Sequence, residues 1–288
     1  MLLVVLACAP VAPSLVLPPD PSRTGAEGAD GPHGAARMDV RVATRVSEGV
    51  GVTVVFPADD DAGPDTSSGV WPVVAVVQGG FVAPERYEWL GRHFASRGYV
   101  TLLADHPLDL AISAPSNTSA ALAALRAEAP EPLDEAFVED APAAVMGHSL
   151  GGVIASWVYQ DDPTFTGLAL LASYPAEGDA LDARDAPQVL SLVGDMDGAT
   201  SLDDAREGAA RYDAWYGEID GMNHYAWTDD PTPGELAGDF EASRDASATR
   251  LDALHVLDTW LDATLRGDAA AAVRLSARQF PNVTATAR

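Results

Sequence analysis

The sequence predicts an α/β protein with a mostly parallel central sheet and helices on both faces. From Trp71 onward, short continuous apolar segments alternate with segments of helical periodicity. Continuous apolar strands are typical of a sheet buried on both faces. With 288 residues, of which 47% are hydrophobic, the chain can bury one large core, so a single domain is expected.

The predicted elements alternate between strand and helix along most of the chain. Two strands with alternating polarity come first, at 40–46 and 51–58, and an acidic loop follows them. Buried strands are predicted at 72–80, 99–105, 143–149, 167–173, 188–195 and 214–221. Helices are predicted at 84–98, 118–129, 150–160, 201–212 and 247–265.

Both ends of this series differ from its middle in composition. Residues 9–38 are rich in proline and glycine and lack apolar periodicity, which predicts a disordered tether. The α/β domain is expected at 39–267, starting near Met38. Residues 268–288 are expected to form a C-terminal tail.

The N-terminal segment 1–8 is a short apolar run that ends at Cys8, the only cysteine. Its last residues, "VLAC", resemble a bacterial lipobox, in which the cysteine is lipidated and becomes the mature N-terminus. This predicts an extracytoplasmic lipoprotein tethered to a membrane through Cys8. An ordinary cleaved signal peptide of a secreted protein and an unprocessed cytoplasmic end are the alternatives. The sequence contains no apolar run of the length that spans a membrane.

Acidic residues dominate the charge. The chain has 43 Asp and Glu against 17 basic residues, all of them arginine, which gives a formal net charge of −26. Without lysine, Schiff-base chemistry and a P-loop are excluded. The negative field disfavours nucleic acid, anionic lipid and anionic substrates, so a small neutral or cationic ligand is expected. Oligomeric state has no signal in the sequence.

The segment "AAVMGHSLGG" places Ser149 between a predicted strand and a predicted helix. Gly147 and Gly151 allow a sharp turn there, with the hydroxyl held clear of the backbone. The first amides of the helix and its positive dipole end would then face a developing oxyanion. These features favour Ser149 as a nucleophile, and a helix-capping serine is the alternative.

A serine nucleophile needs a base and an acid that orients the base, expected in the chain order Ser, Asp or Glu, His. His224 follows the last predicted strand of the parallel series, and Asp195 and Asp197 follow the strand before it. Active sites in this architecture lie at the carboxyl ends of parallel strands. The pattern leaves both aspartates open as the acid. The histidines whose positions fit a base less well are His33, His93, His106, His148 and His255.

An oxyanion needs amide donors from two sides of the nucleophile. The amide of Leu150, directly after the serine, is one predicted donor. The loop after "VVAVV" supplies the other, because Gly79 and Gly80 let the backbone approach a substrate closely. Gly80 is the first choice and Phe81 the second.

Together these motifs resemble the α/β-hydrolases, in particular small serine esterases related to dienelactone hydrolases. The resemblance runs from about Val73 to Leu265 through "QGGFVAPERYEWLGRHFASRGYV", "GHSLGG", "VGDMDG" and "DGMNHY". It implies an α/β-hydrolase fold with Ser149 at a nucleophile elbow. In such enzymes the acid commonly follows a glycine by three residues, which favours Asp197 after Gly194. Dienelactone hydrolases use a cysteine nucleophile, so their substrate is not carried over to this chain.

The resemblance also implies hydrolysis of a carboxylic ester by a catalytic triad, through an acyl-enzyme, without a metal or organic cofactor. Segment 174–191, before the acid, is too short for a helical cap domain. A shallow, open site for short-chain neutral esters is therefore expected. The alternatives are an acyltransferase or perhydrolase on the same triad, a cutinase-like polyester hydrolase, and a non-catalytic tethered binding protein.

Overall fold

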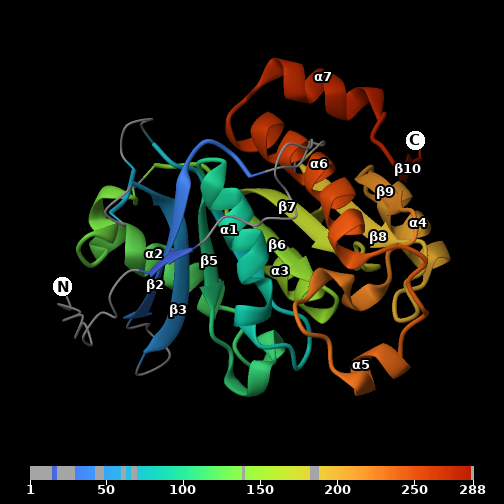
Figure 1. Cartoon of the computed structure of the whole chain (residues 1–288), viewed down its shortest axis with the longest axis horizontal. Helices are drawn as coiled ribbons and strands as arrows, with labels where there is room; N and C mark the ends of the chain where they lie inside the picture. Colours follow the sequence, from blue (N-terminus) through green and yellow to red (C-terminus); the bar gives the residue numbers. More distant parts are fainter. Residues whose placement is uncertain are drawn as a thin grey trace.

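One mixed sheet forms the centre of the molecule (Figure 1). The structure is a computed structural model that describes residues 15–17, 30–42, 49–59, 63–65, 70–137, 140–181 and 188–286. Within these residues, the strands are hydrogen-bonded in the order β1-β2-β3-β5-β4-β6-β7-β8-β9-β10. The strands are β1 (Leu15–Leu17), β2 (Gly34–Val42), β3 (Val50–Ala58), β4 (Val73–Val77), β5 (Val100–Ala104), β6 (Ala143–His148), β7 (Phe165–Leu171), β8 (Val189–Gly194), β9 (Trp215–Ile219) and β10 (Val283–Ala285).

The central part of the sheet is parallel, from β5 through β4, β6, β7 and β8 to β9, and the outer strands pair antiparallel. Strand β4 explains the continuous apolar runs, because every residue in it is buried. Val73 and Val77 pack into one apolar cluster, whereas Val74 and Val76 pack into a second cluster on the opposite face. The predicted fold, a mostly parallel sheet covered on both faces, is confirmed.

The helices divide between these two faces (Figure 1). Buried side chains of α2, α3 and α4 join the first cluster, and those of α1, α6 and α7 join the second. In α6, Leu254, Leu257 and Leu261 lie on one stripe and are fully buried, each contributing about 1.5–3 kcal/mol. The helices are α1 (Glu88–Ser96), α2 (Asn117–Glu128), α3 (Leu150–Asp161), α4 (Leu202–Arg211), α5 (Pro233–Ala237), α6 (Ala246–Leu265) and α7 (Ala269–Ala277), with short 3₁₀ helices η3 (Pro84–Tyr87), η4 (Pro107–Asp109), η5 (Ala111–Ser113), η6 (Leu133–Glu135) and η8 (His224–Trp227).

The ordered fold extends beyond the domain limits expected from composition. Strand β2 begins at Gly34 rather than near Met38, and β1 lies inside the predicted tether, where it pairs antiparallel with β2. The expected C-terminal tail contains α7 and β10, because Leu275 and Phe280 pack into the second cluster. Cys8 and residues 43–46 of the first predicted strand lie outside the described residues.

The connection between β7 and β8 covers residues 172–188, and its described part holds no separate cap domain. No helix in the described part of the chain carries a long apolar stretch of the kind that crosses a bilayer.

Candidate active site

Ser149 occupies the turn between β6 and α3, with backbone dihedrals φ 54° and ψ −124°. Such a conformation costs a non-glycine residue about 1–3 kcal/mol, so its surroundings must hold it. A Cβ on Gly147 would lie 2.1 Å from the Gly151 carbonyl oxygen, and one on Gly151 would lie 2.3 Å from the Gln78 carbonyl oxygen. Only glycine therefore fits on either side. The Ser149 amide donates to the Leu171 carbonyl of β7 (2.9 Å), and the side chain stays partly exposed.

The two predicted oxyanion donors lie next to this turn. Leu150 is the first residue of α3, so its amide has no acceptor within the helix. A Cβ on Gly80 would lie 3.2 Å from Leu150 Cδ2, which places the two residues side by side. The amide of Phe81, the second choice, donates to the Asp109 carbonyl (2.8 Å). Among the described residues, the Gly80 amide has no hydrogen-bond acceptor.

Asp197 and His224 form a buried pair at the ends of β8 and β9. His224 Nδ1 lies 3.0 Å from each carboxylate oxygen of Asp197, and the two residues are 3% and 4% exposed, respectively. Because the carboxylate accepts, we assign the imidazole proton to Nδ1, which leaves Nε2 as the basic nitrogen. Asp197 Oδ1 also accepts from the amides of Ala199 (2.9 Å) and Thr200 (2.6 Å), which fix the orientation of the carboxylate.

Asp195, the other open choice for the acid, has a different partner. Its Oδ1 accepts from the Gly221 amide (2.7 Å), and its own amide donates to the Ile219 carbonyl (3.0 Å). Asp195 thus braces the end of β8 against the end of β9. Of the two aspartates, Asp197 is the one that contacts His224.

Two arginines hold the loop that follows His224, and sequence reasoning missed both. Arg86 in η3 forms a two-pronged ion pair with Glu235 (2.8 and 3.0 Å) and donates to the Asp229 carbonyl (2.7 Å). Arg250 in α6 donates to the Asp229 carboxylate and to the Thr228 carbonyl (both 2.7 Å). Partial burial works against the ionised Glu235 carboxylate, but its hydrogen bonds, chiefly from Arg86, lower its pKa below the usual value.

His148 directly precedes Ser149 in the chain and contacts His224, so it brings the serine turn close to His224. The rings of His148 and His224 lie 4.7 Å apart between centroids, and His148 Nε2 lies 3.1 Å from the His224 carbonyl oxygen. Among the described residues, no hydrogen bond joins the Ser149 hydroxyl to His224. Such bonds are often long in free enzymes and shorten when substrate binds.

The histidines set aside from the sequence have other partners. His106 Nδ1 lies 2.9 Å from Gln78 Oε1, and burial lowers the pKa of His106 to about 4, so it is neutral near pH 7. His93 pairs with Asp258 (2.8 Å), and His33 pairs with Asp65 (2.9 Å). His255 lies in α6 and lines a cavity together with Asp258 and Arg97. Neither Ser149 nor His224 lines this cavity. No group of three or more described His, Cys, Asp or Glu residues has a metal-binding arrangement.

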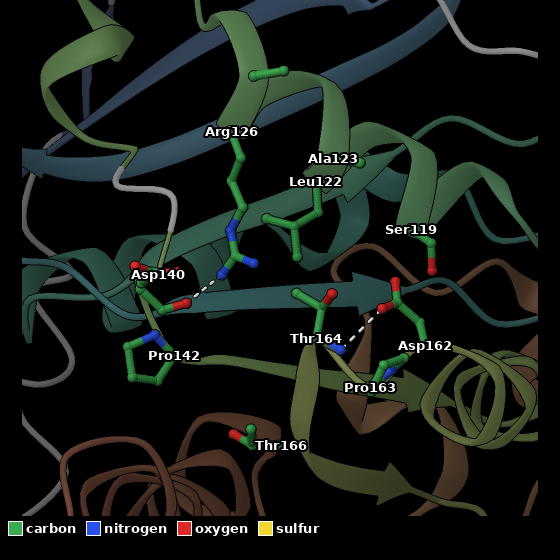
Figure 2. A pocket seen from close by; sticks show the side chains of 12 residues that line it. Ser119, Leu122, Ala123, Arg126, Asp140, Pro142, Asp162, Pro163, Thr164 and Thr166 are labelled. Atoms are coloured by element: carbon green, nitrogen blue, oxygen red, sulfur yellow. Dashed lines mark hydrogen bonds between the residues drawn. The ribbon is translucent and has the colours of Figure 1, made fainter.

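A cavity of about 890 Å³ lies at the opposite edge of the sheet, where β6 and β7 begin (Figure 2). Two polar groups of its lining are bound locally: Arg126 donates to the Ala141 carbonyl, and the Thr164 amide donates to Asp162 (2.9 Å). Among the described residues, its lining contains a serine and two aspartates but no histidine. Hence this cavity lacks the base that a serine nucleophile needs.

Fold and site together define a hydrolase-type α/β protein, with a strained serine turn, a buried His–Asp pair and two amides at the carboxyl edge of the sheet. The model of the alpha/beta hydrolase family matches residues 73–250, which is more than half of the chain. The chain therefore belongs to the alpha/beta hydrolase family, and it is a hydrolase by family. A comparison with curated protein sequences gives no match.

Proposed function

We propose that the protein hydrolyses carboxylic esters through an acyl-enzyme on Ser149. The observation that carries the proposal is the buried pair of His224 and Asp197 beside the strained turn at Ser149. These residues stand in the chain order expected for the family, and a positive φ at a non-glycine residue accompanies functional strain.

Each group has a defined step in the proposed reaction. Ser149 Oγ attacks the ester carbonyl while His224 Nε2 removes its proton. The amides of Gly80 and Leu150 hold the oxyanion of the tetrahedral intermediate. His224 then returns the proton to the departing alcohol, and Asp197 keeps the imidazole in the productive tautomer. Water repeats the attack on the acyl-enzyme, which releases the acid and restores Ser149.

The proposed substrates are small neutral esters with short acyl chains. No separate cap domain is present in the described residues between β7 and β8, so a long acyl chain bound at Ser149 would lie partly uncovered on the surface. Each methylene left in water forgoes about 0.8 kcal/mol of binding. The formal charge of −26 repels anionic esters.

Labelling with a fluorophosphonate tests the nucleophile directly. The wild-type protein should form a stable adduct on Ser149, and the variant Ser149→Ala should form none. Asp195→Asn is the matched control, because this aspartate lies beside the site without contacting His224, and it should label like wild type. An adduct on another residue, or equal labelling of Ser149→Ala, would rule out this mechanism.

The N-terminal segment is proposed to export the protein and to attach it to a membrane through lipid on Cys8. Cys8 lies outside the described residues, so the support is the motif "VLAC" alone. Mass spectrometry of the natively expressed protein should find a diacylated or triacylated N-terminal cysteine. An intact Met1, or cleavage at another position, would end this proposal.

A further inference from the structure

A buried chain of hydrogen bonds joins the oxyanion loop to the histidine. The Gly79 amide donates to Tyr87 Oη (2.9 Å), Tyr87 Oη lies 2.8 Å from His148 Nδ1, and His148 Nε2 lies 3.1 Å from the His224 carbonyl oxygen. Tyr87 and His148 are both fully buried. Neither side chain has a role in the proton transfers described above.

The chemistry of the groups gives every bond in this chain one direction. The Gly79 amide can only donate and the His224 carbonyl can only accept, so His148 carries its proton on Nε2. Burial lowers the pKa of His148 well below its usual value, so Nδ1 is an acceptor. The Tyr87 hydroxyl therefore donates to His148, and burial raises the pKa of this phenol, which keeps the proton in place.

The two ends of the chain belong to the two halves of the proposed active site. Gly79 directly precedes Gly80, whose amide is the proposed oxyanion donor. The other end is the backbone of His224 itself. A Cβ on Gly79 would lie 2.8 Å from His148 Nδ1 and 3.1 Å from Tyr87 Oη, so the loop packs directly on the pair.

The short helix that carries Tyr87 also contacts the histidine loop. Arg86, the preceding residue, binds Glu235 and the Asp229 carbonyl in that loop. Helix η3 is thus held to the oxyanion loop by Tyr87 and to the histidine loop by Arg86. A change in one half of the site would be transmitted to the other through these contacts.

We propose that Tyr87 and His148 are positioning residues that set the separation between the oxyanion amide of Gly80 and the imidazole of His224. The inference rests on the proposed function, because the geometry that it explains is the geometry of that site. In the free protein the pair satisfies two buried backbone groups, the Gly79 amide and the His224 carbonyl. During the reaction the pair would hold the Gly80 amide and the His224 imidazole at a fixed separation while the oxyanion and the imidazolium form.

Tyr87→Phe tests the proposal, and Tyr99→Phe is its matched control. Tyr99 is also buried and donates to Asp262 (2.6 Å), but this bond joins the residue before β5 to α6, away from the site. On a p-nitrophenyl ester, Tyr87→Phe should lower kcat about 10- to 100-fold, with KM within about twofold, because misplaced oxyanion donors cost rates of this order. Tyr99→Phe should lower Tm to a similar extent and leave kcat within about twofold.

Substitution of His148 adds a rescue test. A glutamine offers an oxygen acceptor and an N–H donor, so His148→Gln can replace both contacts, whereas His148→Leu can replace neither. His148→Gln should therefore retain at least about tenfold more of the wild-type kcat than His148→Leu. Equal losses in these two variants, or equal losses in Tyr87→Phe and Tyr99→Phe, would overturn the positioning role.

Rates of fluorophosphonate labelling separate this inference from the proposed function. If wild type is labelled on Ser149 and Tyr87→Phe is labelled equally fast, the positioning role is wrong and the nucleophile stands. If wild-type Ser149 is not labelled, the proposed function is wrong and the positioning role falls with it. Slower labelling of Tyr87→Phe than of Tyr99→Phe supports both.

Discussion

The two edges of the parallel sheet hold polar groups in different ways. At the carboxyl edge, Asp197 and His224 are nearly fully buried and meet from separate strands. At the opposite edge, the lining of the cavity in Figure 2 includes groups that bind backbone nearby, as Asp162 binds the Thr164 amide. Burial costs free energy unless the groups are paired with good geometry. At the carboxyl edge, two buried side chains from separate segments are held against each other, which the formation of a local turn does not require. At the opposite edge, a contact such as that of Asp162 with the Thr164 amide serves a local turn.

The largest expected effect is the loss of kcat when a proposed catalytic residue at the carboxyl edge is replaced. Ser149→Ala and His224→Ala should each lower kcat by about 10⁴ or more with the fold intact, since triad members act as a unit. Steady-state kinetics on a p-nitrophenyl ester, with circular dichroism for the fold, measures this.

Arg126→Ala provides the control at the opposite edge. Its guanidinium donates to the Ala141 carbonyl, so the substitution should affect stability and leave kcat within about twofold. A folded His224→Ala variant with wild-type kcat, or a large loss of kcat in Arg126→Ala, would mean that catalysis does not depend on the carboxyl edge in the way proposed.

Within the carboxyl edge, the two aspartates should differ strongly. Asp197→Asn should lower kcat by about 10⁴, because an amide beside Nδ1 favours the wrong tautomer of His224. Asp195→Asn keeps an oxygen that can accept from the Gly221 amide, so its kcat should fall less than about tenfold. The same kinetic assay ranks the two variants, and the reverse ranking would make Asp195 the acid.

The third prediction concerns pH and a buried histidine at this edge. Burial lowers the pKa of His106 to about 4 from 6.5. Between these two pH values the unfolded chain binds a proton at this histidine that the folded chain does not bind. Stability from this group is fully present above pH 6.5 and is lost as the pH falls to 4, by about 3 kcal/mol in total.

His106→Gln isolates this contribution from that of other titrating groups. Urea unfolding at pH 7 and at pH 4 should show a smaller acid loss for His106→Gln than for wild type. Parallel losses in the two proteins would mean that His106 is protonated in the folded state.

The smallest expected effect concerns acyl length. kcat/KM should be greatest for p-nitrophenyl esters from C2 to C6 and about tenfold lower for long chains, without activation at a lipid interface. A maximum at C12 or longer, or a jump above the micellar concentration, would indicate that the site covers a long apolar chain.

The sequence predicted the parts of the molecule whose signals are local. The continuous apolar run of β4 follows from burial on both faces, and Gly147 and Gly151 mark the turn because a side chain would clash there. The contact of His224 with Asp197 agrees with the chain order and with the spacing after Gly194. The turn and the spacing after Gly194 are each carried by a few neighbouring residues, and the chain order needs no knowledge of contacts.

The contacts that sequence reasoning missed join distant segments. Tyr87 meets His148 across 61 residues, and Arg86 meets Glu235 across 149. Nothing in the residues around Tyr87 or Arg86 distinguishes them from ordinary helix residues, because their partners are set by the topology of the sheet. The helix and strand after Gly267 were missed for a related reason: most of their apolar residues are alanines, and their burial depends on packing against α6 and β9.

Strand β10 has a consequence for how copies of the protein behave at high concentration. Its pairing with β9 occupies backbone groups that would otherwise offer a template for another chain, and β9 leads directly to the histidine loop. β10 is the edge strand on this side of the sheet and is only three residues long, so it offers few unpaired backbone groups to another molecule. Removal of residues after 278 would expose β9 in its full length. Such a truncated chain should form aggregates that scatter light, even though its formal charge remains strongly negative.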